Sequence, residues 1–309
     1  MSSLLTNTSA MVALTTLRHI NDDLATTQNR ISTGQRVSDA SDNAAYWSIA
    51  TTMNSDNDAL SAVQDSLGLG AATVDVAFTA MDQSVEVVSE IKAKLVASTA
   101  PGVDRKKIQS DISELQSQLQ TIADSAVFNG ENWLSEDAAT FNPNKTVVGG
   151  FTRDASGNAS IQNITIDTTD ILLIDTTGTN AILSRDIGAV TGGTNITGAN
   201  MLDFDISAVT DSATDLGELA NVISEVDAKL SAMTDAATAL GSAKSRIDMQ
   251  TEFVKNLSDA VDRGVGQLVD ADMNAESTRL QALQTQQQLG IQALSIANSG
   301  SQNILSLFR

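Results

Sequence analysis

The sequence predicts a mainly α-helical protein, in which the N- and C-terminal halves form a long coiled-coil helical rod and the centre carries a small β-rich insertion. Three observations predict this fold class. Seven-residue apolar repeats run through both halves, and sustained repeats of this kind are typical of coiled coils. The repeats stop between residues 146 and 210. That middle segment is rich in Thr, Gly and Asp, and its short alternating runs favour strands and turns.

The amino-acid composition favours helices and excludes several classes of function. Of the 309 residues, 41% are hydrophobic but only 3% are aromatic, so Ala, Leu, Val and Ile must form the core. The absence of Cys excludes disulfides, thiolate metal sites and cysteine nucleophiles. The net charge of −20 makes nucleic acid and anionic membranes poor partners. The sequence has no apolar run of about eighteen residues, so we expect no membrane span.

The first segment predicts an amphipathic helix. The opening stretch MSSLLTNTSAMVALTTLR has no basic start, and Thr, Asn and Ser interrupt its apolar run, so we expect no cleaved secretory signal. Its apolar positions step by four and three, which predicts one apolar stripe along a helix. The stripe comprises Ala10, Leu14, Leu17, Asn21, Leu24, Gln28 and Ile31.

A much longer repeat begins at Met53 and continues to Leu95. Its positions alternate in steps of three and four, and most of them are apolar. At 1.5 Å per residue, this helix would be roughly 65 Å long. The sequence TAPG at Thr99–Gly102 should end it, because Pro and Gly interrupt helices.

Two further helices carry the same spacing. One is expected from Ile108 to Ala126. The other lies in the second half of the chain. Its seam consists of Leu219, Ile223, Val226, Leu230, Met233, Ala237, Leu240, Ile247, Val254 and Val261. Three helices with complementary seams can form a bundle, so we expect the two halves of the chain to lie side by side.

The C-terminal segment repeats the pattern of the N-terminal one, from Leu280 to Phe308. Two terminal helices with matching stripes most simply pair with each other. The stripes are wider than one seam, so we expect both helices to need further apolar partners. The residues expected to form this assembly surface are Leu14, Leu17, Leu24, Ile31, Leu280, Leu283, Leu294, Ile304, Leu305 and Phe308.

The sequence contains no recognisable catalytic or cofactor-binding motif. His19 is the only histidine and has no nucleophile motif nearby, so we interpret it as a helix-surface side chain. GLGAATVD, which begins at Gly68, lacks the third glycine of a dinucleotide-binding loop. Asp203, Asp205 and Asp211 lack EF-hand spacing and are interpreted as solvated carboxylates. We therefore expect no enzyme, cofactor or metal site. An enzyme carried in the insertion is a less favoured alternative.

Both ends of the chain resemble bacterial flagellin. RISTGQRVSDASDNAA, Arg30 to Ala45, is similar to the family's R-[LI]-S-[ST]-G-x-[RK]-[IV] stretch and the Asp-rich Ala-Ala segment that follows it. FNG at Phe128–Gly130 resembles the turn after the family's short second helix. The last residues, from Gln287, are similar to its ending A-N-x-x-x-Q-N-[VI]-L-x-L-[LF]-R. The matching motif residues are Arg30, Gly34, Arg36, Asp39, Asp42, Asn129, Gly130, Asn298, Gln302, Asn303 and Arg309.

The resemblance implies a structural subunit that self-assembles into the helical flagellar filament, the motility propeller, and is secreted to the cell exterior. It implies a filament-core helical domain from residues 1–42 and 266–309 and a rod domain from 43–145 and 211–265. Residues 146–210 would form a variable β-rich outer domain. The modest insertion and the stretch DADMNAES, Asp270–Ser277, are similar to the short flagellins of alphaproteobacteria.

The resemblance also implies partners. These are further copies of the chain, the flagellar export machinery, and the hook–filament junction and cap proteins, with no nucleic acid and no membrane. The junction protein itself is the main alternative identity, although its C-terminus usually lacks the ending found at Gln302–Arg309. A coiled-coil scaffold that does not polymerise is a further alternative. SEIKAK, Ser89–Lys94, aligns with a Q-R-V-R-E-L-like patch contacted by an animal Toll-like receptor. Glu90 and Ala93 there predict weak or no recognition.

Overall fold

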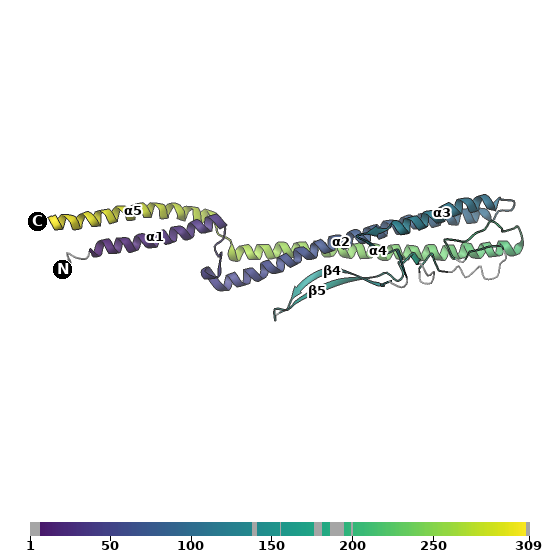
Figure 1. The fold of residues 1–309 in the computed structure, drawn as a ribbon, viewed down its shortest axis with the longest axis horizontal. Coiled ribbons are helices and arrows are strands. Elements are labelled where there is room, and N and C mark those ends of the chain that lie inside the picture. The colour runs from purple at the N-terminus through teal and green to yellow at the C-terminus, as the bar shows by residue number, and fades with distance from the viewer. Residues whose placement is uncertain are drawn as a thin grey trace. The chain divides into compact units, whose positions relative to one another are not determined.

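The computed structural model describes residues 7–137, 141–154, 156–175, 181–185, 195–198 and 200–306, with side chains up to residue 300. Along these residues the helices are α1 (Thr8–Thr33), α2 (Ala40–Ser98), α3 (Arg105–Ser125), α4 (Ala213–Val269) and α5 (Met273–Ser306). The strands are β1 (Val127–Phe128), β2 (Glu131–Asn132), β3 (Ser135–Glu136), β4 (Asn144–Arg153), β5 (Ala159–Asp167) and β6 (Ile174–Asp175). Long helices dominate and the strands lie in the central part of the chain, which confirms the predicted fold class (Figure 1).

The chain divides into two compact units. Unit 1 combines Met1–Asp58 with Leu257–Arg309, and unit 2 is Ala59–Asn256. Helices α2 and α4 therefore contribute to both units. The five-part division expected from the sequence concerns the assembled filament and stays a prediction.

The long repeat of α2 forms the core of unit 2. Every predicted seam position from Leu60 to Leu95 is buried. Ser84 is tolerated in this seam because its hydroxyl donates a hydrogen bond to the Ala80 carbonyl at 2.7 Å. The helix ends at Ser98, directly before the TAPG sequence that predicted its end.

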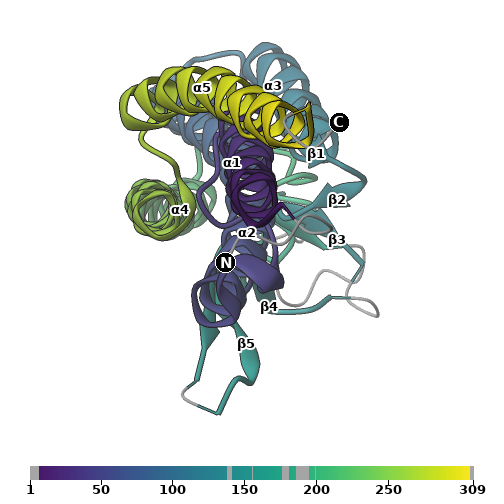
Figure 2. The same cartoon turned by 90° about the vertical axis from the view of Figure 1, so that its left-hand side faces the viewer.

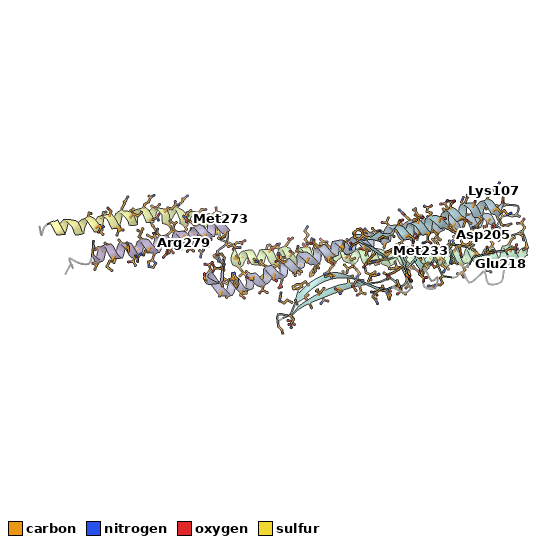
Figure 3. All side chains as sticks on the ribbon, viewed as in Figure 1. Lys107, Asp205, Glu218, Met233, Met273 and Arg279 are labelled. Carbon is orange, nitrogen blue, oxygen red and sulfur yellow. The ribbon has the colours of Figure 1, made fainter. Side chains whose placement is uncertain are left out.

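Helices α3 and α4 pack along this part of α2 (Figure 1). Lys94 of α2 pairs with Asp111 of α3 at 2.6 Å, and Lys244 of α4 pairs with Asp75 of α2 at 2.5 Å. Exposed pairs of this kind contribute only about 0–1 kcal/mol each, so apolar burial must hold the bundle together. Met233 of α4, labelled in Figure 3, is fully buried and belongs to this core.

The buried stripe of α4 differs from the prediction at every second position. Val222, Lys229 and Ala236 are buried, whereas the predicted Ile223, Leu230 and Ala237 are only half-buried. Both stripes share every other position, and a seven-residue period fits either flank of an apolar face. Lys229 can occupy the buried flank because its stem packs while its Nζ donates to the Arg185 carbonyl at 3.4 Å.

Two antiparallel hairpins follow α3. Strands β1 and β2 are joined by Asn129 and Gly130, whose φ angles of 51° and 83° suit the tight turn that Asn-Gly favours. Strands β4 and β5 form the longer hairpin. This hairpin lies on the helices, because Val147 of β4 covers Gly70 of α2 and Gln250 Nε2 of α4 donates to the β4 backbone at 2.6 Å. Strand β3 pairs in parallel with β6.

The described segment before α4 packs against α3. Phe204 is fully buried, and its carbonyl accepts hydrogen bonds from Gln116 at 3.1 Å and Gln109 at 3.2 Å. The Gln109 side chain also accepts a bond from the Ile206 backbone at 3.0 Å. The described parts of residues 146–210, expected as an outer domain, thus lie in one compact unit with the rod helices.

In unit 1, helices α1 and α5 run side by side, as Figures 1 and 2 both show. The expected pairing of the terminal helices is therefore found. The start of α2 and the end of α4 form a second pair in this unit. Asn57 donates to Asp262 at 2.6 Å and accepts from Ser258 at 2.5 Å. Gly264 allows close approach there, since a Cβ on it would stand 3.0 Å from Met53 Cε.

Candidate functional site

Most of the predicted site residues that the structure describes fall on the terminal helices and on the segments that join them to α2 and α4. Among the described residues, no three His, Asp or Glu side chains are arranged to hold a metal ion. His19 is exposed on α1. None of the helices in the described part of the chain has a stretch long and apolar enough to cross a membrane.

The α1–α5 pair has a narrow apolar seam. Leu283 is buried at its centre. At Gly290 the two helices approach closely, because a Cβ on this residue would stand 3.3 Å from Leu17 Cδ1. Beside the seam, Gln287 donates to the exposed Asn21 Oδ1 at 2.7 Å. Half-buried along the seam are the predicted residues Leu17, Leu24, Ile31, Leu280 and Leu294.

Large apolar side chains remain on the outward faces of this pair. As in α4, the seam of α1 lies one residue earlier than expected at alternate positions. Ala13, Ile20 and Thr27 face inward, whereas Leu14, Asn21 and Gln28 are exposed. Apart from Met273 (43%) at the start of α5, the exposed large apolar residues of the pair are Met11 (62%), Val12 (65%), Leu14 (39%), Leu289 (59%), Ile291 (54%) and Ile296 (70%). We call these six residues the outward apolar surface.

Polar contacts join the two helices at both ends. Asn7 caps α1 by accepting from the Ala10 backbone at 3.1 Å, and it donates to the Ala297 carbonyl of α5 at 3.0 Å. At the other end, Arg30 Nη1 pairs with Glu276 Oε1 at 3.1 Å. Glu276 is nearly buried. Removal of either partner would therefore be destabilising, because it would leave an uncompensated charge largely shielded from water. Sequence reasoning missed Glu276, because 246 residues separate it from its partner.

The motif residues Gly34 and Arg36 satisfy carbonyl groups at the C-terminal ends of α1 and α4. Gly34 adopts the left-handed conformation with φ 74° and closes α1 by donating to the Arg30 carbonyl at 2.8 Å. The Arg36 guanidinium donates to the Leu268 carbonyl at 2.9 Å, and its backbone donates to Val269 at 2.6 Å. These carbonyls belong to the last turn of α4, where acceptors lack helical partners and a positive charge is favourable.

The segments 34–39 and 270–272, which we call the junction, are bonded to each other. Gln35 and Asp270 form an antiparallel bridge. The backbone of Ala271 donates to the Gly34 carbonyl at 2.9 Å. The links from α1 to α2 and from α4 to α5 therefore form one two-stranded connection.

Polar side chains order the starts of the helices that leave the junction. Asn43 has a non-helical backbone and caps the continuous part of α2 by accepting from the Ala45 and Tyr46 backbones at 3.1 and 3.2 Å. The acidic motif residues order the turn before it. Asp42 accepts a hydrogen bond from the Ser38 backbone at 3.0 Å, and this bond lowers the pKa of Asp42. Asp39 accepts a similar hydrogen bond from the Ser41 backbone at 2.7 Å. Asp272 caps α5 by accepting from Asn274 at 2.9 Å. Sequence reasoning missed Asp272, although an Asp directly before a helical pattern is the usual capping signal. Met273 and Arg279 follow it on α5 (Figure 3).

The remaining motif residues are spread along the chain. Asn129 and Gly130 form the β1–β2 turn, in unit 2. Asn298 is exposed on α5. Gln302, Asn303, Ile304 and Leu305 belong to the last turns of α5, where only the backbone is described. Phe308 and Arg309 lie outside the described residues.

Comparisons of the sequence with known families and proteins agree on one family. The family model for the bacterial flagellin N-terminal helical region matches residues 4–139, and the model for the C-terminal helical region matches residues 223–308. Flagellin C of Rhizobium meliloti (strain 1021) is 52% identical over 100% of both chains. The flagellin of Brucella melitensis biotype 1 is 45% identical over 100% of both chains. The crystal structure of Bacillus cereus flagellin is 16% identical, with a TM-score of 0.40, and covers 64% of this chain and 94% of its own.

With both terminal regions matched and full-length relatives at this identity, the chain belongs to the bacterial flagellin family and is of the alphaproteobacterial type.

Proposed function

We propose that copies of this protein join through their α1–α5 pairs, which form the core of the flagellar filament. As a flagellin, the chain is a structural subunit of that filament and serves motility. The relatives are flagellins, which favours the filament subunit over the junction protein. The observation that carries the assembly proposal is the outward apolar surface, most of which is more than half exposed.

A second copy is the partner that fits this surface best. Contact between apolar side chains gains about 25 cal/mol per Å² removed from water. Every copy carries the same faces, so each can supply the cover that the other lacks. The net charge of −20 works against such contacts at long range but is screened over about 8 Å at physiological ionic strength.

The α1–α5 pair is only marginally stable in the free subunit under this proposal. Its seam is narrow, and of the predicted assembly residues whose side chains are described only Leu283 is buried. Ordering a residue costs about 1–2 kcal/mol in backbone entropy, which a single thin seam offsets poorly. Contacts with neighbouring copies would stabilise the pair, so folding of the terminal helices is coupled to assembly. This coupling restrains polymerisation before the subunit reaches the growing end.

The proposed route to the cell exterior is the flagellar export machinery. The chain has no cysteine, so no disulfide would hinder the passage of an unfolded chain through a narrow channel. Marginal stability of the α1–α5 pair also suits unfolding before export. We propose the hook–filament junction protein and the cap protein as partners at the two ends of the filament. There they would contact the same outward apolar surface that a neighbouring copy contacts.

Replacing Ile296 tests the assembly role of α5. Ile296→Asp should raise the critical concentration for polymerisation at least about tenfold, because it places a charge in an apolar contact. The matched control is Ser295→Asp, which adds the same charge at the adjacent exposed position and should polymerise like the wild type. Sedimentation and electron microscopy give the readout, and circular dichroism checks that unit 2 remains folded.

Two results would contradict the proposal, and they are distinguishable. If the wild-type protein formed only discrete rods under all polymerising conditions, the proposal that it assembles into filaments would be wrong. If Ile296→Asp formed normal filaments, the protein would still be a filament subunit, but α5 would not contribute to the contact between copies.

A further inference from the structure

Unit 2 carries an open apolar groove between α2 and α3. The groove has a volume of about 590 Å³. Its apolar lining comes from Val76 and Ala80 of α2 and from Ile122 and Ala126 at the end of α3. We call it the α2–α3 groove.

The same unit carries an exposed apolar projection on α4. Met249 is 62% exposed and Phe253 is 58% exposed, and neither lines the groove. They are four residues apart, and Arg246 precedes Met249 by three, so all three lie on one face of the helix. We call these three residues the α4 knob. Arg246 is exposed and has no ion pair within the described part of the chain.

One end of the groove is acidic. Asp75 and Thr79 line the groove, and Asp82 and Glu86 continue the same stripe of α2 at helical spacing. On α3, Glu114 lies one turn before the lining residue Gln118. Asp82, Glu86 and Glu114 are exposed, and none has an ion pair among the described residues. Three unpaired carboxylates thus lie near the groove, and one unpaired guanidinium lies on the knob.

We propose that the α4 knob of one subunit docks in the α2–α3 groove of a second copy, with Arg246 facing Asp82, Glu86 and Glu114. The occupant is another copy because the complementary knob is carried by the chain itself, and in the single chain this knob is exposed to solvent. The charges complement each other across an apolar contact, which fixes the orientation of docking. The proposal rests on the proposed filament function and names the surfaces of unit 2 that meet.

The geometry of this contact suits a filament. Knob and groove are different patches, so the contact is heterologous and each subunit offers one of each. A heterologous contact whose rotation does not close a ring generates an open helical array. Filament growth requires a contact of this heterologous kind, because each added subunit then leaves one knob or one groove open for the next.

Cross-linking tests the docking directly, because the wild-type chain has no cysteine. Subunits with Phe253→Cys are mixed with subunits carrying Thr121→Cys, a groove-lining position, then polymerised and treated with a short bis-maleimide. The matched control replaces Thr121→Cys with Val96→Cys, an exposed position of α2 that does not line the groove. We expect at least about tenfold more cross-linked dimer with the groove variant, and none from unpolymerised mixtures.

A charge exchange tests the orientation. Arg246→Glu should raise the critical concentration about tenfold, and adding Glu86→Arg should restore most of the loss. The control is Lys255→Glu, the same charge change on another face of α4, with an effect below about twofold.

The failure of the inference differs from the failure of the proposed function. If well-formed filaments cross-link equally at groove and control positions, or if Arg246→Glu and Lys255→Glu act alike, the docking is overturned while the filament function stands. If the wild type does not polymerise, the proposed function fails first.

Discussion

Val147 on strand β4 lies directly over Gly70 on helix α2, where a Cβ on the glycine would stand 2.8 Å from Val147 Cγ2. Gly68 lies in the same helix, and a Cβ there would meet nothing within 4 Å. Glycine in a helix costs about 1 kcal/mol relative to alanine. Gly68→Ala should therefore raise the free energy of unfolding by up to about 1 kcal/mol, whereas Gly70→Ala should lower it by about 1–3 kcal/mol because β4 must move.

Chemical unfolding followed by circular dichroism measures both glycine variants on the same scale. The Gly68 variant controls for the general effect of alanine in α2. If Gly70→Ala were as stable as Gly68→Ala, the hairpin would not be seated on α2 as described.

Hydrogen exchange should separate the terminal helices from the centre of α2. We expect amides of α1 and α5 to exchange rapidly in the monomer and slowly in the filament, because neighbouring copies cover their outward apolar surface. Amides of Met53–Leu95 should be protected in both states, since most of this seam is fully buried within the chain. Strong protection of α1 and α5 in a verified monomer would contradict coupled folding.

From the sequence we also expect Phe308→Asp to block assembly and leave unit 2 folded.

The start of α4 should make unit 2 sensitive to acid. Asp215 accepts hydrogen bonds from the side chain and backbone of Thr210 and from Asn195, and these lower its pKa from 3.8 to about 2. A carboxyl whose pKa falls on folding stabilises the folded state above the unfolded pKa, and this contribution is lost as pH falls through the folded value. Stability should therefore fall between pH 3.8 and about 2.

Urea unfolding over this pH range tests the role of Asp215. Asp215→Asn should be less stable than the wild type at neutral pH and should lose less stability on acidification. Asp248→Asn, which removes an exposed carboxylate from the same helix, should keep the wild-type profile. Equal acid sensitivity in the wild type and Asp215→Asn would contradict the assignment.

We expect this protein to activate the animal Toll-like receptor weakly, because of the residues in Ser89–Lys94. Glu90 is exposed and carries the opposite charge to the arginine of the aligned patch. Lys92 and Lys94 are already paired, with Asp227 and Asp111. A reporter-cell assay should show weak or absent activation and a gain on Glu90→Arg. A wild-type response equal to that of an activating flagellin would refute this expectation.

The elements with long uniform repeats were predictable from the sequence. The seam of α2 was predicted position by position from Leu60 to Leu95, because one helix face is buried along its whole length. In α1 and α4 the repeat predicted the helix but not which flank of the stripe is buried. Val222 and Ile223 have similar hydrophobicity, so only the placement of neighbouring helices decides between them.

The features that depend on distant partners were not predictable. The pairing of Arg30 with Glu276 joins residues 246 positions apart, and neither side chain signals its partner locally. The segment before α4 has no helical period, yet it is fixed to α3 by Gln109 and Gln116. The motif around Gly34 and Arg36 was recognised as a family pattern. Its physical role as a set of helix caps became visible only from the structure.

The two-stranded junction has a mechanical consequence for a propeller that is turned from its base. A single covalent linker acts as a swivel, since rotation about its backbone dihedrals is soft. Here two linkers run side by side and are bonded at Gln35–Asp270 and Gly34–Ala271, so neither can rotate without breaking those bonds. Torque applied to α1 and α5 therefore passes into α2 and α4 through both linkers at once.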